Sequence, residues 1–157
     1  MFSLRKKPDF EKAFAIMTDA EAKKGKLKSA RRALSNKKLT PFEYKALVFL
    51  CAVRGVWFEG DPVKDSYNVL MNAIEDFGFF KEIVRCVSDS FVFRFYETYA
   101  VKPNFYALAY LSFAHYYGWA TNKNIHKAKE LVRRAQKFNE NYPTKDITER
   151  TFKKILS

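Results

Sequence analysis

The chain has 157 residues, the length of one ordinary domain, so it can bury a core without disulfides or metals. Hydrophobic residues make up 48% of the chain and aromatic residues 17%, which excludes a disordered protein. Only five glycines and five prolines interrupt it, which favours long regular elements, and its net charge is +12.

The positive charge is concentrated in the two terminal regions. Residues 1–40 carry a net charge of +8 and residues 123–157 one of +6, whereas residues 41–122 carry −2. Such asymmetry favours an anionic partner, which could be nucleic acid, anionic lipid or an acidic protein. The alternative is that the basic residues only solvate helix faces, and composition alone does not separate the two interpretations.

The first forty residues predict two helices. Pro8-Asp9 is typical of a helix start with Asp9 as the capping residue, and apolar residues follow at helical spacing. Gly25 interrupts this pattern, and a second helix is expected with Leu27, Ala30, Ala33 and Leu34 on one face, closed by Asn36. The face of this second helix opposite its apolar residues carries four basic side chains: Lys24, Lys28, Arg31 and Arg32.

The clearest helix start in the sequence is Thr40-Pro41. Thr40 is a capping residue, proline suits the first helical position, and Glu43 completes a capping box. The helix that follows is strongly apolar, above all over 46–53, and is expected to lie at the centre of the core. We expect Gly60-Asp61-Pro62 to end this helix and start the next, and Gly78 to end that next helix.

The segment 79–102 fits two structures. Its stretch SFVFRFYETYAV alternates apolar and polar residues and is rich in aromatic and β-branched types, a pattern that fits a strand. A lone strand among helices would have no ladder partner, and no other segment resembles a strand. We therefore predict that this segment is helical.

The rest of the chain predicts further helices with short connections. The expected elements are a helix starting at Pro103, a turn near Thr121-Asn122, a basic helix from Ile125 to Phe138, a break at Pro143 and a last helix capped by Thr144 or Asp146. The total is about eight or nine helices, mostly paired. Because no linker or low-complexity tract interrupts the chain, we expect one all-α domain over residues 1–157.

The region 106–138 has the spacing of a helical repeat. Leu111 is expected to pack inward, and Gly118 lies seven residues later, where the first helix must turn. Ala128 and Ala135 are seven residues apart on one face of the second helix, and their small size permits close helix approach. The aromatic residues around His115 are then interpreted as repeat core, with a ligand pocket as the alternative.

This spacing resembles the Sel-one-like repeat, a relative of the tetratricopeptide repeat. The matching residues are Leu111, Gly118, Lys127-Ala128 and Ala135, and the departures from the usual pattern are Ser112, His115, Thr121 and Asn124. A weaker second match over 44–78 rests on Gly60, Lys64 and Ala73. The resemblance implies antiparallel helix pairs stacked as a short α-solenoid that binds proteins, and it brings no catalytic residues.

The sequence offers little for catalysis or metal binding. Cys51 and Cys86 lie in apolar stretches without metal-ligand spacing, so we interpret them as buried reduced thiols, with a disulfide left open. His115 and His126 supply at most half a zinc site. No phosphate-binding loop, nucleophile elbow or metalloprotease motif is present. We therefore expect no cofactor, no metal and no enzymatic activity.

The expected location is the cytoplasm. The amino terminus has charges but lacks the apolar core of a secretory signal. The longest uncharged apolar run, 46–53, is too short to span a bilayer.

These observations predict a non-enzymatic protein-binding module, an adaptor, inhibitor or immunity-type partner of another protein with an acidic surface. The alternative is a nucleic-acid-binding protein that uses the basic N- and C-terminal helices, and a basic amphipathic helix can also lie on an anionic membrane. The candidate partner-binding residues are Lys28, Arg31, Arg32, Lys127, Arg133, Arg134 and Lys137. We expect the four arginines among them to be largely exposed.

Overall fold

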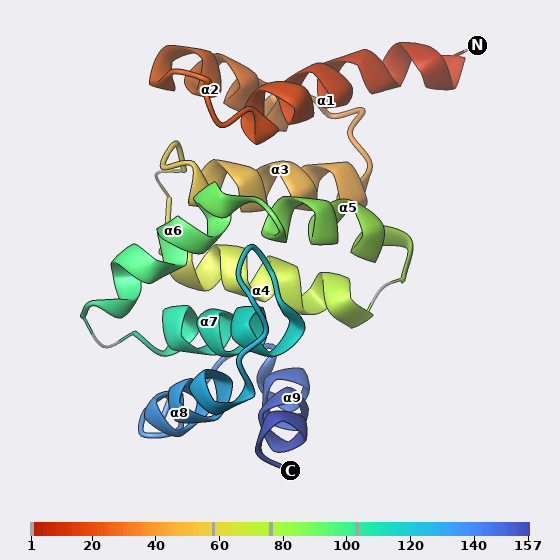
Figure 1. The fold of residues 1–157 in the computed structure, drawn as a ribbon. Helices are drawn as coiled ribbons and strands as arrows, with labels where there is room; N and C mark the ends of the chain where they lie inside the picture. The colour runs from red at the N-terminus through yellow and green to blue at the C-terminus, as the bar shows by residue number, and fades with distance from the viewer. Residues whose placement is uncertain (1, 58, 76, 103) are drawn as a thin grey trace. The chain divides into compact units, whose positions relative to one another are not determined.

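The computed structural model describes the backbone of residues 2–57, 59–75, 77–102 and 104–157, and the side chains of these residues other than 2–8, 75, 77–80 and 82. Every regular element in these ranges is helical, which confirms the all-α prediction (Figure 1). The described elements are nine α-helices and one short 3-10 helix, as expected from the sequence. None of the helices in the described ranges is long and apolar enough to cross a membrane.

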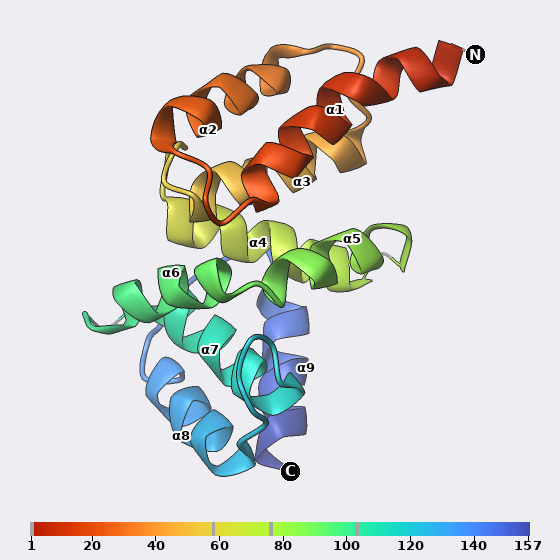
Figure 2. The same ribbon diagram turned by 45° about the horizontal axis from the view of Figure 1, so that its top comes forward.

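The chain forms two compact units, one up to Val69 and one from Leu70 onward. The N-terminal unit contains α1 (Phe2–Thr18), α2 (Lys24–Arg31), the 3-10 helix η1 (Arg32–Ser35), α3 (Pro41–Val53) and the first part of α4 (Pro62–Glu75). Within this unit α1 packs against both α2 and α3 (Figure 2). Its core takes Phe10, Phe14 and Met17 from α1 and Leu27 and Ala30 from α2.

The start and the burial of α3 follow the sequence. The backbone N–H of Glu43 donates to Thr40 Oγ1 at 3.1 Å, and the Thr40 N–H donates to Glu43 Oε1 at 3.0 Å. This reciprocal pair is the expected capping box. Every residue of the apolar run 46–53 is buried, so α3 supplies the centre of the unit's core.

Several expected boundaries in this unit are wrong. The first helix begins at Phe2, so Asp9 lies inside it and accepts a hydrogen bond from Asn36 Nδ2 instead of capping a helix start. Gly25 lies in the first turn of α2, because a single glycine lowers helix propensity by only about 1 kcal/mol. The third helix ends at Val53, before Gly55, which has φ +75°.

The expected start of α4 is confirmed. Pro62 is its first residue, and Asp61 Oδ1 accepts hydrogen bonds from the N–H groups of Val63 at 3.0 Å and Lys64 at 3.3 Å. Gly60 therefore precedes a helix start without ending the previous helix.

The C-terminal unit contains the rest of α4 and then α5 (Phe77–Val87), α6 (Ser90–Ala100), α7 (Phe105–Tyr117), α8 (Ile125–Ala135) and α9 (Lys145–Leu156). Its central element is α7, which packs against α6, α8 and α9. All residues of α7 from Phe105 to Ala114 are buried. This explains why α7 is apolar around its whole circumference.

The ambiguous segment 79–102 is helical, as predicted, and forms most of α5 and all of α6. Gly78 lies inside α5 and does not end α4, so that expectation is wrong. The expected helix start at Pro103 lies outside the described residues. The following helix begins at Phe105, and Asn104 caps it by accepting a hydrogen bond from the Ala107 N–H at 3.0 Å.

The last two helices differ from expectation only at their ends. The basic helix α8 ends at Ala135, three residues before the expected Phe138. Thr144 is the residue before α9, as expected, but its side chain makes no capping hydrogen bond.

A tight hairpin joins α7 to α8, which run in opposite directions (Figure 2). Gly118 ends α7 with φ +81°, and its N–H donates to the Ala114 carbonyl at 2.8 Å. The turn closes where the Asn124 N–H donates to the His115 carbonyl at 2.8 Å. Ala128 and Ala135 are both fully buried, so the predicted helix end and the burial of the two alanines are confirmed.

Candidate binding surfaces

The basic residues of α2 and η1 do not form the single exposed group that the sequence predicts. Lys28 and Arg32 are exposed. Arg31 is half-buried, and its guanidinium donates to the Val56 carbonyl at 2.9 Å. Arg31 follows the buried Leu27 by one helical turn, which places it beside the apolar face. The expectation that Arg31 is largely exposed is therefore wrong, and this side chain has a structural contact within its own unit.

Arg32 lines a shallow groove between α1 and the α2–η1 segment. The groove has a volume of about 390 Å³, and Lys12 of α1 is a second basic residue that lines it. Small residues, Ala13, Ala30 and Ala33, form much of its wall. Asp9 also lines the groove, which therefore combines two cations and one carboxylate with small apolar residues.

The second group of predicted residues lies on α8. This helix buries Ala128, Leu131, Val132 and Ala135 at helical spacing, which fixes its opposite face outward. Arg133, Arg134 and the following Lys137 are exposed, as expected for the two arginines. Within the described part of the chain none of these three cations forms a salt bridge.

Lys127 differs from these three cations because it has a partner. Its Nζ lies 3.7 Å from Glu130 Oε1, one helical turn away, and both side chains are about half exposed. Such an exposed pair contributes little to stability. Glu130 is the only acidic residue of α8, and it is already paired with Lys127. The other cations of this helix are therefore uncompensated within it.

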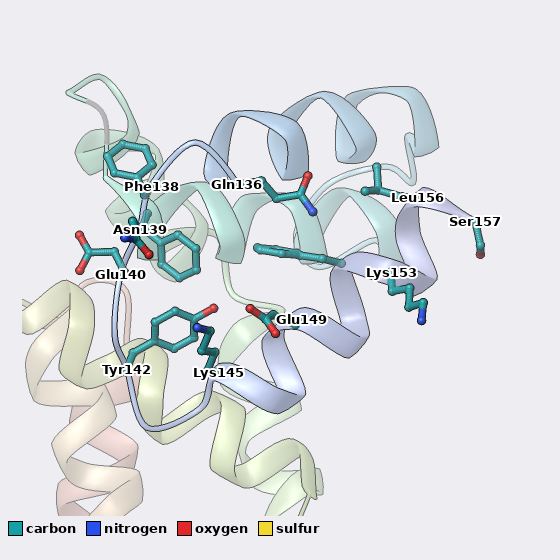
Figure 3. Close-up of a pocket in the computed structure, with 12 residues that line it drawn as sticks. Gln136, Phe138, Asn139, Glu140, Tyr142, Lys145, Glu149, Lys153, Leu156 and Ser157 are labelled. Atoms are coloured by element: carbon teal, nitrogen blue, oxygen red, sulfur yellow. The ribbon is translucent and has the colours of Figure 1, made fainter.

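A pocket of about 530 Å³ lies in the C-terminal unit, between the carboxyl end of α8, the connection to α9, and α9 itself (Figure 3). Three nearly buried rings contribute to its wall: Phe105, Tyr142 and Phe152. The ring centroid of Phe105 lies 4.7 Å from that of Tyr142 and 6.1 Å from that of Phe152. Aromatic rings packed at such distances stabilise one another's positions.

Charged side chains of both signs line the mouth of this pocket. Glu140 and Glu149 carry negative charge, and Lys145 and Lys153 carry positive charge. Burial is the main cause that raises the pKa of Tyr142 to about 12, and the Glu149 carboxylate adds to it. The phenol is therefore neutral at physiological pH and cannot act there as a base.

The histidine in the aromatic stretch is half-buried in the C-terminal unit. Its ring meets Phe93 edge to face at 5.8 Å, and its Nδ1 atom is buried without a hydrogen-bond partner among the described residues. Burial, followed by the positive charge of Lys127, lowers the pKa of His115, while Glu97 opposes them. No cluster of three metal-ligating side chains occurs in the described ranges.

Neither cysteine forms a disulfide, and both are buried thiols. Burial raises the pKa of Cys51 to about 12, against the opposing effect of the Arg31 charge. A thiol held neutral in this way is a poor nucleophile and a poor metal ligand.

The sequence did not reveal the pocket. Its wall comes from Phe105 at the start of α7, Tyr142 in a connection and Phe152 in α9, and no local pattern links them. The one available signal was the helical spacing of Lys145, Glu149 and the buried Phe152 along one side of α9.

Comparison of the chain with protein-family models, with curated proteins and with solved structures gives no match.

Proposed function

We propose that this chain is a non-enzymatic binding module that contacts an acidic surface of another protein, with the outward face of α8 as its principal contact. The observation that carries the proposal is that Arg133 and Arg134 of α8, and Lys137 just after its end, are exposed without a salt bridge in the described part of the chain.

Uncompensated like charges on one helix face repel one another, since residues three or four apart are neighbours. A partner that supplies carboxylates would relieve this repulsion. Arginine suits the contact because its planar guanidinium binds a carboxylate through two hydrogen bonds. The buried face of α8 holds the helix in place, so little ordering of the backbone is required on binding.

The N-terminal unit offers a secondary contact. Lys28 and Arg32 are exposed there, and Arg32 lies at the groove between α1 and α2. Arg31 is not included, because its guanidinium already donates to the Val56 carbonyl. The resemblance to the Sel-one-like repeat supports this proposal, because helical-repeat scaffolds present extended binding surfaces without chemistry of their own.

The test is the double charge reversal Arg133→Glu/Arg134→Glu, compared with wild type in capture from a lysate with and without nuclease. The matched control is Lys37→Glu/Lys38→Glu, which changes the net charge equally at two exposed lysines. We expect wild type and the control variant to capture one discrete protein, both with and without nuclease. The double mutant should not capture it. The affinity of wild type for this protein should fall with rising salt concentration.

Two results would overturn the proposal. One is the recovery of nucleic acid alone, which would favour the alternative of binding through the basic helices. The other is a captured protein that binds the double mutant as tightly as wild type at both low and high salt.

A further inference from the structure

The basic face of α8 leads to the aromatic pocket. Lys129, Arg133 and Gln136 are spaced four and three residues apart, so they form one row along the side of α8. Gln136, the last of the row, lines the pocket and points toward it in Figure 3. The row spans about 10 Å at the helical rise of 1.5 Å per residue.

The pocket is large enough to receive one large aromatic side chain, and three aromatic rings lie in its wall. Its volume of about 530 Å³ lies within the range of ligand-binding cavities. The rings of Phe105, Tyr142 and Phe152 are nearly buried, so packing fixes their positions before a ligand arrives and each exposes only a small part of its surface to the pocket. Aromatic anchors that enter such preformed pockets dominate many protein interfaces.

The charges at the mouth of the pocket do not favour a ligand of either sign of charge. Glu140 and Glu149 are matched by Lys145 and Lys153, and none of the four forms a salt bridge within the described residues. In the row that leads to the pocket, the uncompensated charges are those of Lys129 and Arg133. An extended peptide advances about 3.4 Å per residue, so the row of α8 corresponds to about three peptide residues.

We propose that the pocket receives an aromatic side chain of the protein partner, and that acidic residues within three positions of this side chain bind Arg133 and Lys129. The inference rests on the proposed function and names the kind of segment that the partner contributes: an acidic stretch with one aromatic anchor.

The probe is a fluorescently labelled peptide with one tryptophan, flanked on each side by glutamate at the first and third positions, and the same peptide with alanine in place of tryptophan. We expect wild type to bind the tryptophan peptide at least about tenfold more tightly than the alanine peptide, the loss typical of a truncated anchor. Both affinities should decrease in Arg133→Glu/Arg134→Glu.

Blocking the mouth of the pocket tests the contribution of the aromatic anchor separately from that of the basic side chains. Asn139 is an exposed residue at the mouth, and Asn139→Trp should reduce binding of the tryptophan peptide to that of the alanine peptide. The matched control is Asn122→Trp, at an exposed position of the α7–α8 turn, which should leave the ratio unchanged. If circular dichroism shows that Asn139→Trp is misfolded, Gln136→Trp replaces it.

The outcomes distinguish the two proposals. Equal binding of both peptides to wild type, with loss in the charge-reversal mutant, overturns the pocket proposal and leaves the proposed function standing. A tryptophan preference that survives Asn139→Trp and Gln136→Trp also overturns it. Absence of binding for both peptides at millimolar concentration overturns the pocket proposal, while the lysate experiment decides the proposed function independently.

Discussion

Replacement of Ala128 by leucine tests the packing that holds α8 in place. The Ala128 side chain is fully inaccessible on the face that α8 turns toward the core of its unit. Leucine adds three carbon atoms at a position with no exposed surface to receive them, so α8 must shift outward or its neighbours must adopt strained rotamers. Overpacking of this kind costs about 1–3 kcal/mol of unfolding free energy.

The two tryptophans make a local assay available, because Trp57 lies in the N-terminal unit and Trp119 in the C-terminal unit. Trp119 is only 9% exposed, and its ring stacks on that of Tyr117 with the ring centroids 5.3 Å apart. Its fluorescence emission therefore reports unfolding of its own unit. In a Trp57→Phe background, urea unfolding followed by Trp119 emission should show a lower midpoint for Ala128→Leu. The slope of the free energy against urea should stay the same.

The matched control is Ala15→Leu, the same substitution at an exposed position of α1, followed by Trp57 emission in a Trp119→Phe background. Leucine and alanine differ little in helix propensity, so this variant should unfold close to its parent. An Ala128→Leu protein with the midpoint and slope of its parent would refute the argument that Ala128 sits at a close helix contact.

Three further measurements follow from the local structure. Gly118→Ala places a side chain on a backbone with φ +81° and should cost the C-terminal unit about 1–2 kcal/mol in the same urea assay; an unchanged midpoint would contradict this. Cys51, whose pKa is raised to about 12, should not react with a disulfide reagent at pH 8 in the folded protein but should react in denaturant. Reaction at the rate of an exposed thiol would show that the site is open. The pKa of His115 should lie below 6.5 in a nuclear magnetic resonance titration, because burial and Lys127 disfavour its charged form. Since the unfolded chain then binds this proton more readily, His115 should lower the stability of its unit as pH falls below 6.5, and a titration midpoint at or above 6.5 would rule this out.

Features determined by neighbouring residues could be predicted from the sequence. The capping box at Thr40 and Glu43 needs only a three-residue spacing, and both of its hydrogen bonds are present. Gly118 was identifiable because a left-handed residue at a helix end is usually glycine. The burial of the run 46–53 followed from its composition.

Features determined by distant contacts could not be predicted. Arg31 belongs to the basic face by composition, but its guanidinium bonds to Val56, 25 residues further along the chain. Arg54 is a similar case, since it donates at the carboxyl end of α1 to the carbonyls of Met17 at 2.7 Å and Asp19 at 2.9 Å. A charge pattern on one helix shows which side chains are basic, and only the tertiary fold shows which of them already have a partner.

The basic side chains and the pocket of the proposed site depend on the fold in different ways. Arg133 and Lys129 keep their charge in any conformation, so a loosened C-terminal unit would still attract acidic proteins weakly. The pocket, in contrast, exists only while Gln136 at the end of α8 and Phe152 of α9 are held around Phe105 of α7. Selectivity for an aromatic anchor therefore requires the close packing of α8, to which Ala128 and Ala135 contribute by their small size. Displacement of α8 should remove the aromatic preference first and the salt-dependent attraction last, which links the packing of the hairpin to the specificity of binding.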